Sequence, residues 1–158
     1  MTTDPKRPAV RLQRTIPAPP HEVYRAWLDA GLLRRWLTPG YEVSRIEVDA
    51  RVGGHVRIWH AAGGAEMGGF DAEILELDED RRLVFRWGFV GPKRRAGPAY
   101  DTLLTITVRA TADGMTALTL VNERLDDLAA AMPAVADQVQ RGWETVLAHL
   151  DTLVKTTP

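Results

Sequence analysis

Hydrophobic and polar residues alternate along most of the chain. Over residues 10–16 the apolar side chains fall on one face and most polar ones on the other, which predicts a first strand. Arg14 is the charged exception on the apolar face. The alternation returns near residue 43 and predicts six further strands, because short turns rich in glycine or aspartate separate the apolar runs. These strands cover about residues 43–49, 55–60, 70–77, 83–87, 104–108 and 118–120.

Two other parts of the chain repeat every three or four residues, as amphipathic helices do. After Pro20 two short helices are predicted, the first ending at Gly31 and the second before Pro39-Gly40. A third and much longer helix is predicted from about Ala134 to Val154. Its apolar stripe needs a sheet to lie on.

The order of elements is therefore one strand, two short helices, six strands and one long helix. Short turns make successive strands neighbours, so the predicted sheet is antiparallel and the fold class is α+β. We expect one domain over residues 9–158, preceded by a loose tail at residues 1–8.

Composition excludes several classes of function. The 158 residues contain no cysteine, which excludes a disulfide scaffold, a thiol nucleophile and a thiolate metal site. Serine occurs once, at Ser44, so the G-x-S-x-G signature is absent. A net charge of −1 and the lack of a basic helix disfavour nucleic acid as a partner. The chain shows neither a signal peptide nor an apolar run of about 20 residues, so we expect a cytoplasmic protein that does not bind a membrane.

Several short stretches, taken in order from about residue 10 to residue 154, resemble one known family. They are Arg14-Thr15-Ile16-Pro17-Ala18-Pro19, Asp49-Ala50-Arg51-Val52-Gly53-Gly54, Leu83-Val84-Phe85-Arg86-Trp87 and Gly142-Trp143. The chain is similar to the SRPBCC superfamily, whose fold is the START-like helix grip. Within it, the chain resembles the bacterial homologues of the C-terminal domain of the heat shock protein ATPase activator. The resemblance implies a curved antiparallel sheet of six or seven strands, two short helices after the first strand, and a long C-terminal helix packed across the sheet.

The resemblance also implies a cavity between the sheet and the C-terminal helix. We therefore expect the protein to bind a small hydrophobic or aromatic molecule there. Two alternatives stay open, namely a cyclase- or hydrolase-type enzyme that uses the same cavity and a module that interacts with a chaperone. The chain carries no recognisable catalytic motif, which favours binding over catalysis. No cofactor is predicted, and a homodimer is compatible with the sequence.

Aromatic and polar side chains on the strands and helices are the candidates for lining this cavity. Aromatic rings can stack on a planar ligand, but each of these rings could equally belong to the core. The predicted ligand-binding residues are Arg14, Trp36, Trp59, His60, Phe70, Trp87, Tyr100, Asn122, Trp143 and Leu147. Asn122 stands where relatives often carry a histidine, so its role would be hydrogen bonding and not proton transfer.

His60 and Tyr100 are the candidates for a catalytic residue. His60 has the parity of Val56 and Ile58, so it faces the cavity if that side of the strand does. The alternative is a solvated strand end. The four histidines lack the spacing of metal ligands, so no metal site is predicted.

Arg14 is a candidate anchor for a polar group of the ligand. A charged side chain on a core face must be paired or line a wet cavity, unless it reaches solvent along the edge of the sheet. Together with Glu73, Arg86, Tyr100 or Asp101 it could present such a polar anchor to a ligand.

Overall fold

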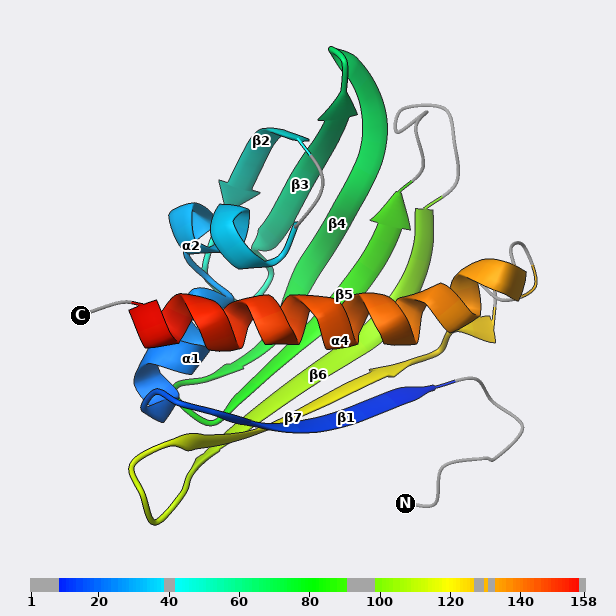
Figure 1. The fold of residues 1–158 in the computed structure, drawn as a ribbon. Helices are drawn as coiled ribbons and strands as arrows, with labels where there is room; N and C mark the ends of the chain where they lie inside the picture. Colours follow the sequence, from blue (N-terminus) through cyan, green and yellow to red (C-terminus); the bar gives the residue numbers. More distant parts are fainter. Residues whose placement is uncertain (1–8, 39–41, 91–98, 127–129, 131–132, 157–158) are drawn as a thin grey trace.

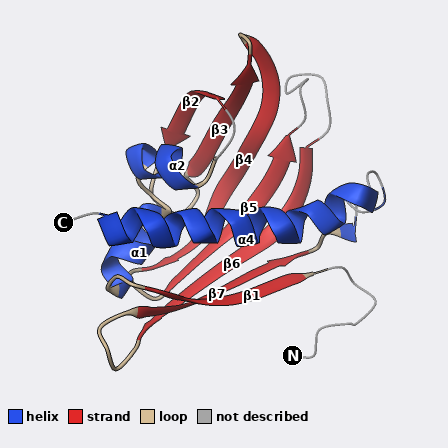
Figure 2. Cartoon of the chain, in the orientation of Figure 1, coloured by secondary structure: helices blue, strands red, loops and turns tan. Residues whose placement is uncertain are grey.

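A twisted sheet of seven antiparallel strands forms one layer, and a long helix crosses it (Figures 1 and 2). The computed structural model describes residues 9–38, 42–90, 99–126, 130 and 133–156, so the predicted tail at residues 1–8 lies outside the described part. The elements are β1 (Val10–Ile16), α1 (Pro20–Ala26), α2 (Ala30–Trp36), β2 (Glu42–Val48), β3 (His55–Ala62), β4 (Ala65–Asp78), β5 (Arg82–Val90), β6 (Ala99–Ala110), β7 (Thr116–Glu123) and α4 (Pro133–Thr156). The predicted α+β helix-grip fold and its element order are confirmed.

The strands are arranged in the order β1-β7-β6-β5-β4-β3-β2. From β2 to β7, strands that follow each other in the sequence are neighbours in the sheet, as short turns require. The first strand is the exception, because β1 pairs with β7 at the far edge, with Val10 opposite Asn122 and Ile16 opposite Thr116. The two short helices fill the connection that carries the chain from β1 to the opposite edge strand, β2 (Figure 1).

Local sequence signals set the ends of the short helices. Pro20 occupies the first turn of α1, where its missing N–H costs nothing, and Glu22 follows near the positive end of the helix dipole. Asp29 caps α2 by accepting a hydrogen bond from the backbone N–H of Leu32 at 3.0 Å. Both helices present buried faces to the core, including Val23 and Leu33.

The face of the sheet toward α4 carries the core. Register places side chains of equal parity side by side across the strands, for example Ile74, Phe85 and Leu104 on β4, β5 and β6. All three are fully buried. The stripe of α4 that meets them consists of Val139, Trp143, Val146, Leu147, Leu150 and Leu153.

A bulge in β4 resolves an ambiguity in the sequence pattern. The register with β5 shifts between Ile74 and Glu76, so two residues of β4 occupy the space of one. As a result Ile74 points into the core, whereas Leu75 is 42% exposed. Simple alternation along the strand could not distinguish these two positions.

Candidate ligand-binding cavity

A cavity of about 310 Å³ lies between α4 and the sheet. Its sheet side is formed by one residue from each of three neighbouring strands, His60 on β3, Phe70 on β4 and Phe89 on β5. The remaining lining residues are Leu37, Gln138, Val139, Gly142, Trp143, Thr145 and Val146. Apolar side chains therefore dominate the wall, which is typical of sites for small organic ligands.

Aromatic rings form a continuous wall along the strands. His60 and Phe70 meet edge to face with ring centroids 5.5 Å apart, and Phe70 meets Phe89 in the same way at 5.6 Å. Behind this wall lies Trp87, whose ring centroid is 5.2 Å from that of Phe70 and 5.6 Å from that of Trp143. Such edge-to-face contacts stabilise one arrangement of the rings and keep the wall rigid.

Trp143 is fixed by a buried chain of hydrogen bonds between α4 and the sheet. Its indole Nε1 donates to Asn122 Oδ1 on β7 at 3.1 Å. Asn122 Nδ2 donates in turn to Thr102 Oγ1 at 2.8 Å and to the carbonyl of Leu103 at 3.1 Å. Thr102 Oγ1 then donates to the carbonyl of Trp87 at 2.9 Å. Because its N–H is used inside the protein, Trp143 presents carbon atoms to the cavity.

His60 is buried, with 6% of its surface exposed, although imidazole is a polar group. It lies on the face of β3 that carries Val56 and Ile58, as the parity of the strand predicted. The structure therefore brings together three of the predicted ligand-binding residues, His60, Phe70 and Trp143.

Five further predicted residues are close to the cavity but do not line it. Trp36 is fully buried between the short helices, where its Nε1 donates to the carbonyl of Ala26 at 3.0 Å. Tyr100 lies opposite Phe89 and packs at the edge of the core. The other three residues, Trp87, Asn122 and Leu147, are buried behind the wall.

Two predicted positions lie elsewhere. Trp59 alternates with Ile58 and His60, so it points to the other face of the sheet, where the Arg45 guanidinium stacks 5.1 Å above its ring. Arg14 lies on the edge strand β1 opposite Leu118 and does not line the cavity. β7 and β6 lie between Arg14 on β1 and Arg86 on β5, so these two side chains do not form one anchor.

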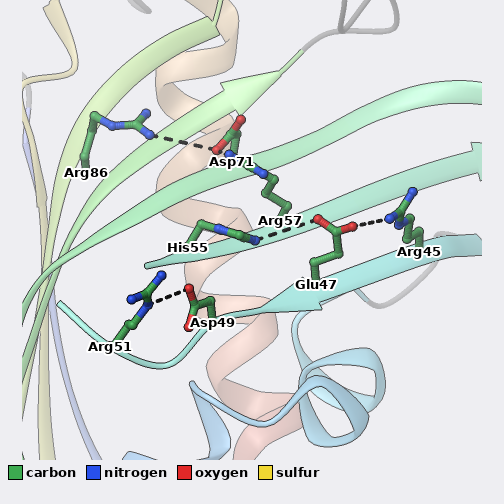
Figure 3. A network of polar contacts seen from close by, with 8 residues as sticks. All are labelled: Arg45, Glu47, Asp49, Arg51, His55, Arg57, Asp71 and Arg86. Atoms are coloured by element: carbon green, nitrogen blue, oxygen red, sulfur yellow. Dashed lines mark hydrogen bonds and ion pairs between the residues drawn. The ribbon is translucent and has the colours of Figure 1, made fainter. Parts of the chain in front are cut away.

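Two of the residues considered with Arg14, Glu73 and Asp101, instead pair with Arg86 on the outer face of the sheet. Arg86 donates to Asp101 at 2.7 Å and lies 3.6 Å from Glu73 and 3.9 Å from Asp71. Figure 3 shows how Arg86 and Arg57 both approach Asp71.

The same outer face carries further ion pairs nearer the β2 edge. Asp49 and Arg51, which flank the turn before Gly53 and Gly54, form an ion pair at 2.8 Å. Glu47 lies between Arg45 and His55, as Figure 3 shows. These ion pairs are partly exposed to solvent and do not line the cavity.

Sequence reasoning missed most of the helix side of the cavity. Val139, Gly142 and Val146 share the stripe of Trp143, so the spacing of three and four residues could have identified them. Phe89 lies on the same face of β5 as Phe85 and Trp87, so the alternation along the strand could have identified it. The missed residues are Leu37, Phe89, Gln138, Val139, Gly142, Thr145 and Val146.

Among the described residues, one group of potential metal ligands occurs at the surface, away from the cavity. His21 Nδ1 lies 2.9 Å from Asp80 Oδ1, and Glu79 is close to both. These three side chains are largely exposed to solvent. The surface pair formed by His21 and Asp80 explains why they lie close together. Nearby, burial and the negative charges of Glu79, Asp80 and Asp78 raise the pKa of Tyr24 above 10.0.

The fold and the cavity together define an α+β helix-grip protein in which a long C-terminal helix covers an apolar cavity on the sheet. The chain belongs to the family described as "Activator of Hsp90 ATPase homolog 1-like protein", whose model matches residues 17–155. The resemblance inferred from the sequence motifs is therefore confirmed. A search of curated proteins found no match.

Solved structures of similar proteins share this fold. Protein CV1439 from Chromobacterium violaceum is 31% identical over 95% of this chain and 99% of its own, with a TM-score of 0.77. Protein Ms6760 from Mycobacterium smegmatis is 22% identical over 99% of this chain and 97% of its own, also with a TM-score of 0.77. DynU16, a protein in the dynemicin biosynthetic locus, is 23% identical over 94% of this chain and 48% of its own, with a TM-score of 0.67. Within the described residues, no helix has the length and apolar character needed to cross a membrane.

Proposed function

We propose that the protein binds a small, mostly apolar molecule in the cavity between α4 and the sheet. The observation that carries this proposal is the shape of the site, a cavity of about 310 Å³ whose inner wall consists of Phe70, Phe89 and Trp143. This volume is at the lower end of the range for small-molecule sites, roughly 300–1,000 Å³. Binding to the folded state alone would stabilise the protein by about 2.7 kcal/mol at a ligand concentration 100 times Kd.

Gly142 supports the proposal because it keeps the cavity open. It lies within the 24 residues of α4, where glycine costs about 1 kcal/mol relative to alanine. A Cβ added to Gly142 would meet no atom within 4 Å, so packing does not explain the glycine. Its position on the cavity wall explains the glycine, because any side chain there would occupy the space offered to a ligand.

The enzymatic alternative has less support. General acid–base catalysis commonly uses a titratable group that a second group orients. Among the described residues, His60 is the single titratable side chain on the cavity wall, and Tyr100 does not reach that wall. A cytoplasmic location and a homodimer stay predictions from the sequence.

The proposal is tested by filling the cavity from the helix. Calorimetry would measure the binding of naphthalene and 2-naphthol to the wild type, to Gly142→Leu and to Gln140→Leu. Gln140 is exposed on α4 and does not line the cavity, so its substitution controls for an added leucine on the same helix. We expect Gln140→Leu to bind like the wild type, and Gly142→Leu to bind at least about tenfold more weakly, which corresponds to about 1.4 kcal/mol.

Two results would contradict the proposal. Equal binding by Gly142→Leu and the wild type would show that the probes bind elsewhere on the protein. If neither probe bound the wild type, and a wider set of apolar molecules caused no thermal shift, the cavity would not be a binding site.

A further inference from the structure

The polar atoms that reach the cavity are few and unevenly placed. Gln138 and Thr145 are exposed on α4 and therefore lie at the mouth, and the Thr145 hydroxyl donates to the carbonyl of Arg141 at 2.9 Å. Trp143 uses its indole N–H on Asn122. His60 is the buried lining residue that brings ring nitrogens to the inner wall.

The described lining residues also bring no carboxylate, ammonium or guanidinium group to the cavity. Among the described residues, no Asp, Glu, Lys or Arg lines the cavity. A charged ligand group buried there would lose its hydration without gaining a counter-ion, which is strongly unfavourable. The buried part of the ligand is therefore uncharged.

The remaining contacts favour a flat aromatic body. Phe70 and Phe89 line the cavity from the sheet, and Trp143 lines it from α4. Aromatic pairs gain free energy beyond the burial of area when their rings meet edge to face or offset. On the helix side, the absent side chain of Gly142 leaves room against the backbone of α4 for a thin molecule.

We propose that the ligand is an uncharged molecule of fused or linked aromatic rings with one hydroxyl group, whose rings lie between Phe70, Phe89 and Trp143 and whose hydroxyl bonds to the imidazole of His60. This inference rests on the proposed function, because it names the class of ligand for the same cavity. A neutral imidazole offers one donor and one acceptor, and a hydroxyl can pair with either. At the packing density of protein interiors, about 0.74, a cavity of about 310 Å³ holds roughly 230 Å³ of atoms, which suits two to four rings.

Three small probes separate the parts of this inference. 2-Naphthol has both the aromatic rings and the hydroxyl, naphthalene lacks the hydroxyl, and decahydro-2-naphthol keeps the hydroxyl on a saturated ring system. Their dissociation constants would be measured by calorimetry on the wild type, on His60→Phe and on Thr145→Val. His60→Phe keeps an aromatic ring beside Phe70 but removes the nitrogens, whereas Thr145→Val removes a hydroxyl at the mouth as a matched control.

We expect the preference for 2-naphthol over naphthalene, corrected for their partition between water and octanol, to be roughly 2- to 12-fold in the wild type. His60→Phe should abolish this preference while keeping the affinity for naphthalene, and Thr145→Val should retain it. 2-Naphthol should also bind more tightly than decahydro-2-naphthol after the same correction.

Each contrary outcome overturns one part of the proposal about the ligand. A preference that persists in folded His60→Phe assigns the hydroxyl to another residue. If His60→Phe does not fold, the wild type alone still tests the role of His60. A partition-corrected preference for 2-naphthol over naphthalene below about twofold would then overturn that role. Tighter binding of decahydro-2-naphthol overturns the aromatic class. In all these cases binding in the cavity stands. A wild type that binds none of the three probes overturns the ligand class, and the proposed function itself fails only if a wider set of apolar molecules also causes no thermal shift.

Discussion

The hydrogen bond between Trp143 and Asn122 allows a quantitative test of how α4 is fastened to the sheet. Asn122→Leu keeps the approximate volume of the side chain but removes the acceptor of Trp143 Nε1 and the donor to Thr102 and Leu103. An unpaired buried donor costs about 1–3 kcal/mol, and each lost hydrogen bond about 0.5–1.5 kcal/mol. Because leucine regains some apolar contact, we expect a total destabilisation of about 2–5 kcal/mol. For a chain of this length, this lowers Tm by roughly 4–20 °C.

A double-mutant cycle isolates the bond itself. Trp143→Phe, Asn122→Leu and the double variant would be compared with the wild type by urea unfolding. Each single variant leaves one partner unpaired, whereas the double variant removes both. The double variant should therefore be less destabilised than the sum of the single variants by about 1–3 kcal/mol.

Trp87→Phe provides the matched control. Trp87 is as deeply buried as Trp143, but its Nε1 has no hydrogen-bond partner among the residues that the structure describes. Its replacement removes a similar volume and no hydrogen bond, so Trp143→Phe should destabilise the protein more than Trp87→Phe. A coupling energy below about 0.5 kcal/mol between Trp143 and Asn122 would refute the reasoning, because the bond would then contribute little to stability.

Two further predictions concern stability and pH. Gly142→Ala should raise the free energy of unfolding by about 1 kcal/mol in a thermal melt, because alanine favours the helix and its Cβ meets no atom within 4 Å; a destabilised variant would contradict this. Because the pKa of Tyr24 is raised above 10.0 in the folded state, the folded protein retains the phenol proton where the unfolded chain loses it. The stabilisation from Tyr24 is therefore complete below pH 10.0 and is lost as the pH rises above that value. The urea midpoint of the wild type should fall above pH 10.0, and it should fall less steeply in Tyr24→Phe. An equally steep fall in Tyr24→Phe would assign the effect to other groups.

The element order and much of the helix side of the core could be predicted from periodicity. The same is true of His60, because the parity of β3 placed it with Val56 and Ile58 on one face. Parity also explains why Trp59 does not line the cavity. Trp59 and His60 are adjacent in a straight strand, so they cannot both face the same cavity.

The extent of the cavity along each strand could not be predicted. Trp87 and Phe89 share a face and lie two residues apart, yet Trp87 belongs to the filled core and Phe89 to the cavity wall. The difference depends on how α4 packs against the sheet, and that is a property of tertiary packing. The role of Asn122 was hidden for a related reason, since its partner Trp143 lies 21 residues away and only the docking of α4 brings the two together.

The pairing of β1 with β7 has a consequence for how the protein is made. During synthesis β1 emerges before the other six strands, but its partner strand ends at residue 123, so this edge of the sheet cannot close until that residue has left the ribosome. The apolar face of the sheet then stays uncovered until α4, which follows all seven strands in the sequence, packs on it. Contacts so distant in sequence slow folding and prolong the exposure of apolar surface. The helix that completes the cavity is therefore also the element that ends the aggregation-prone stage of folding.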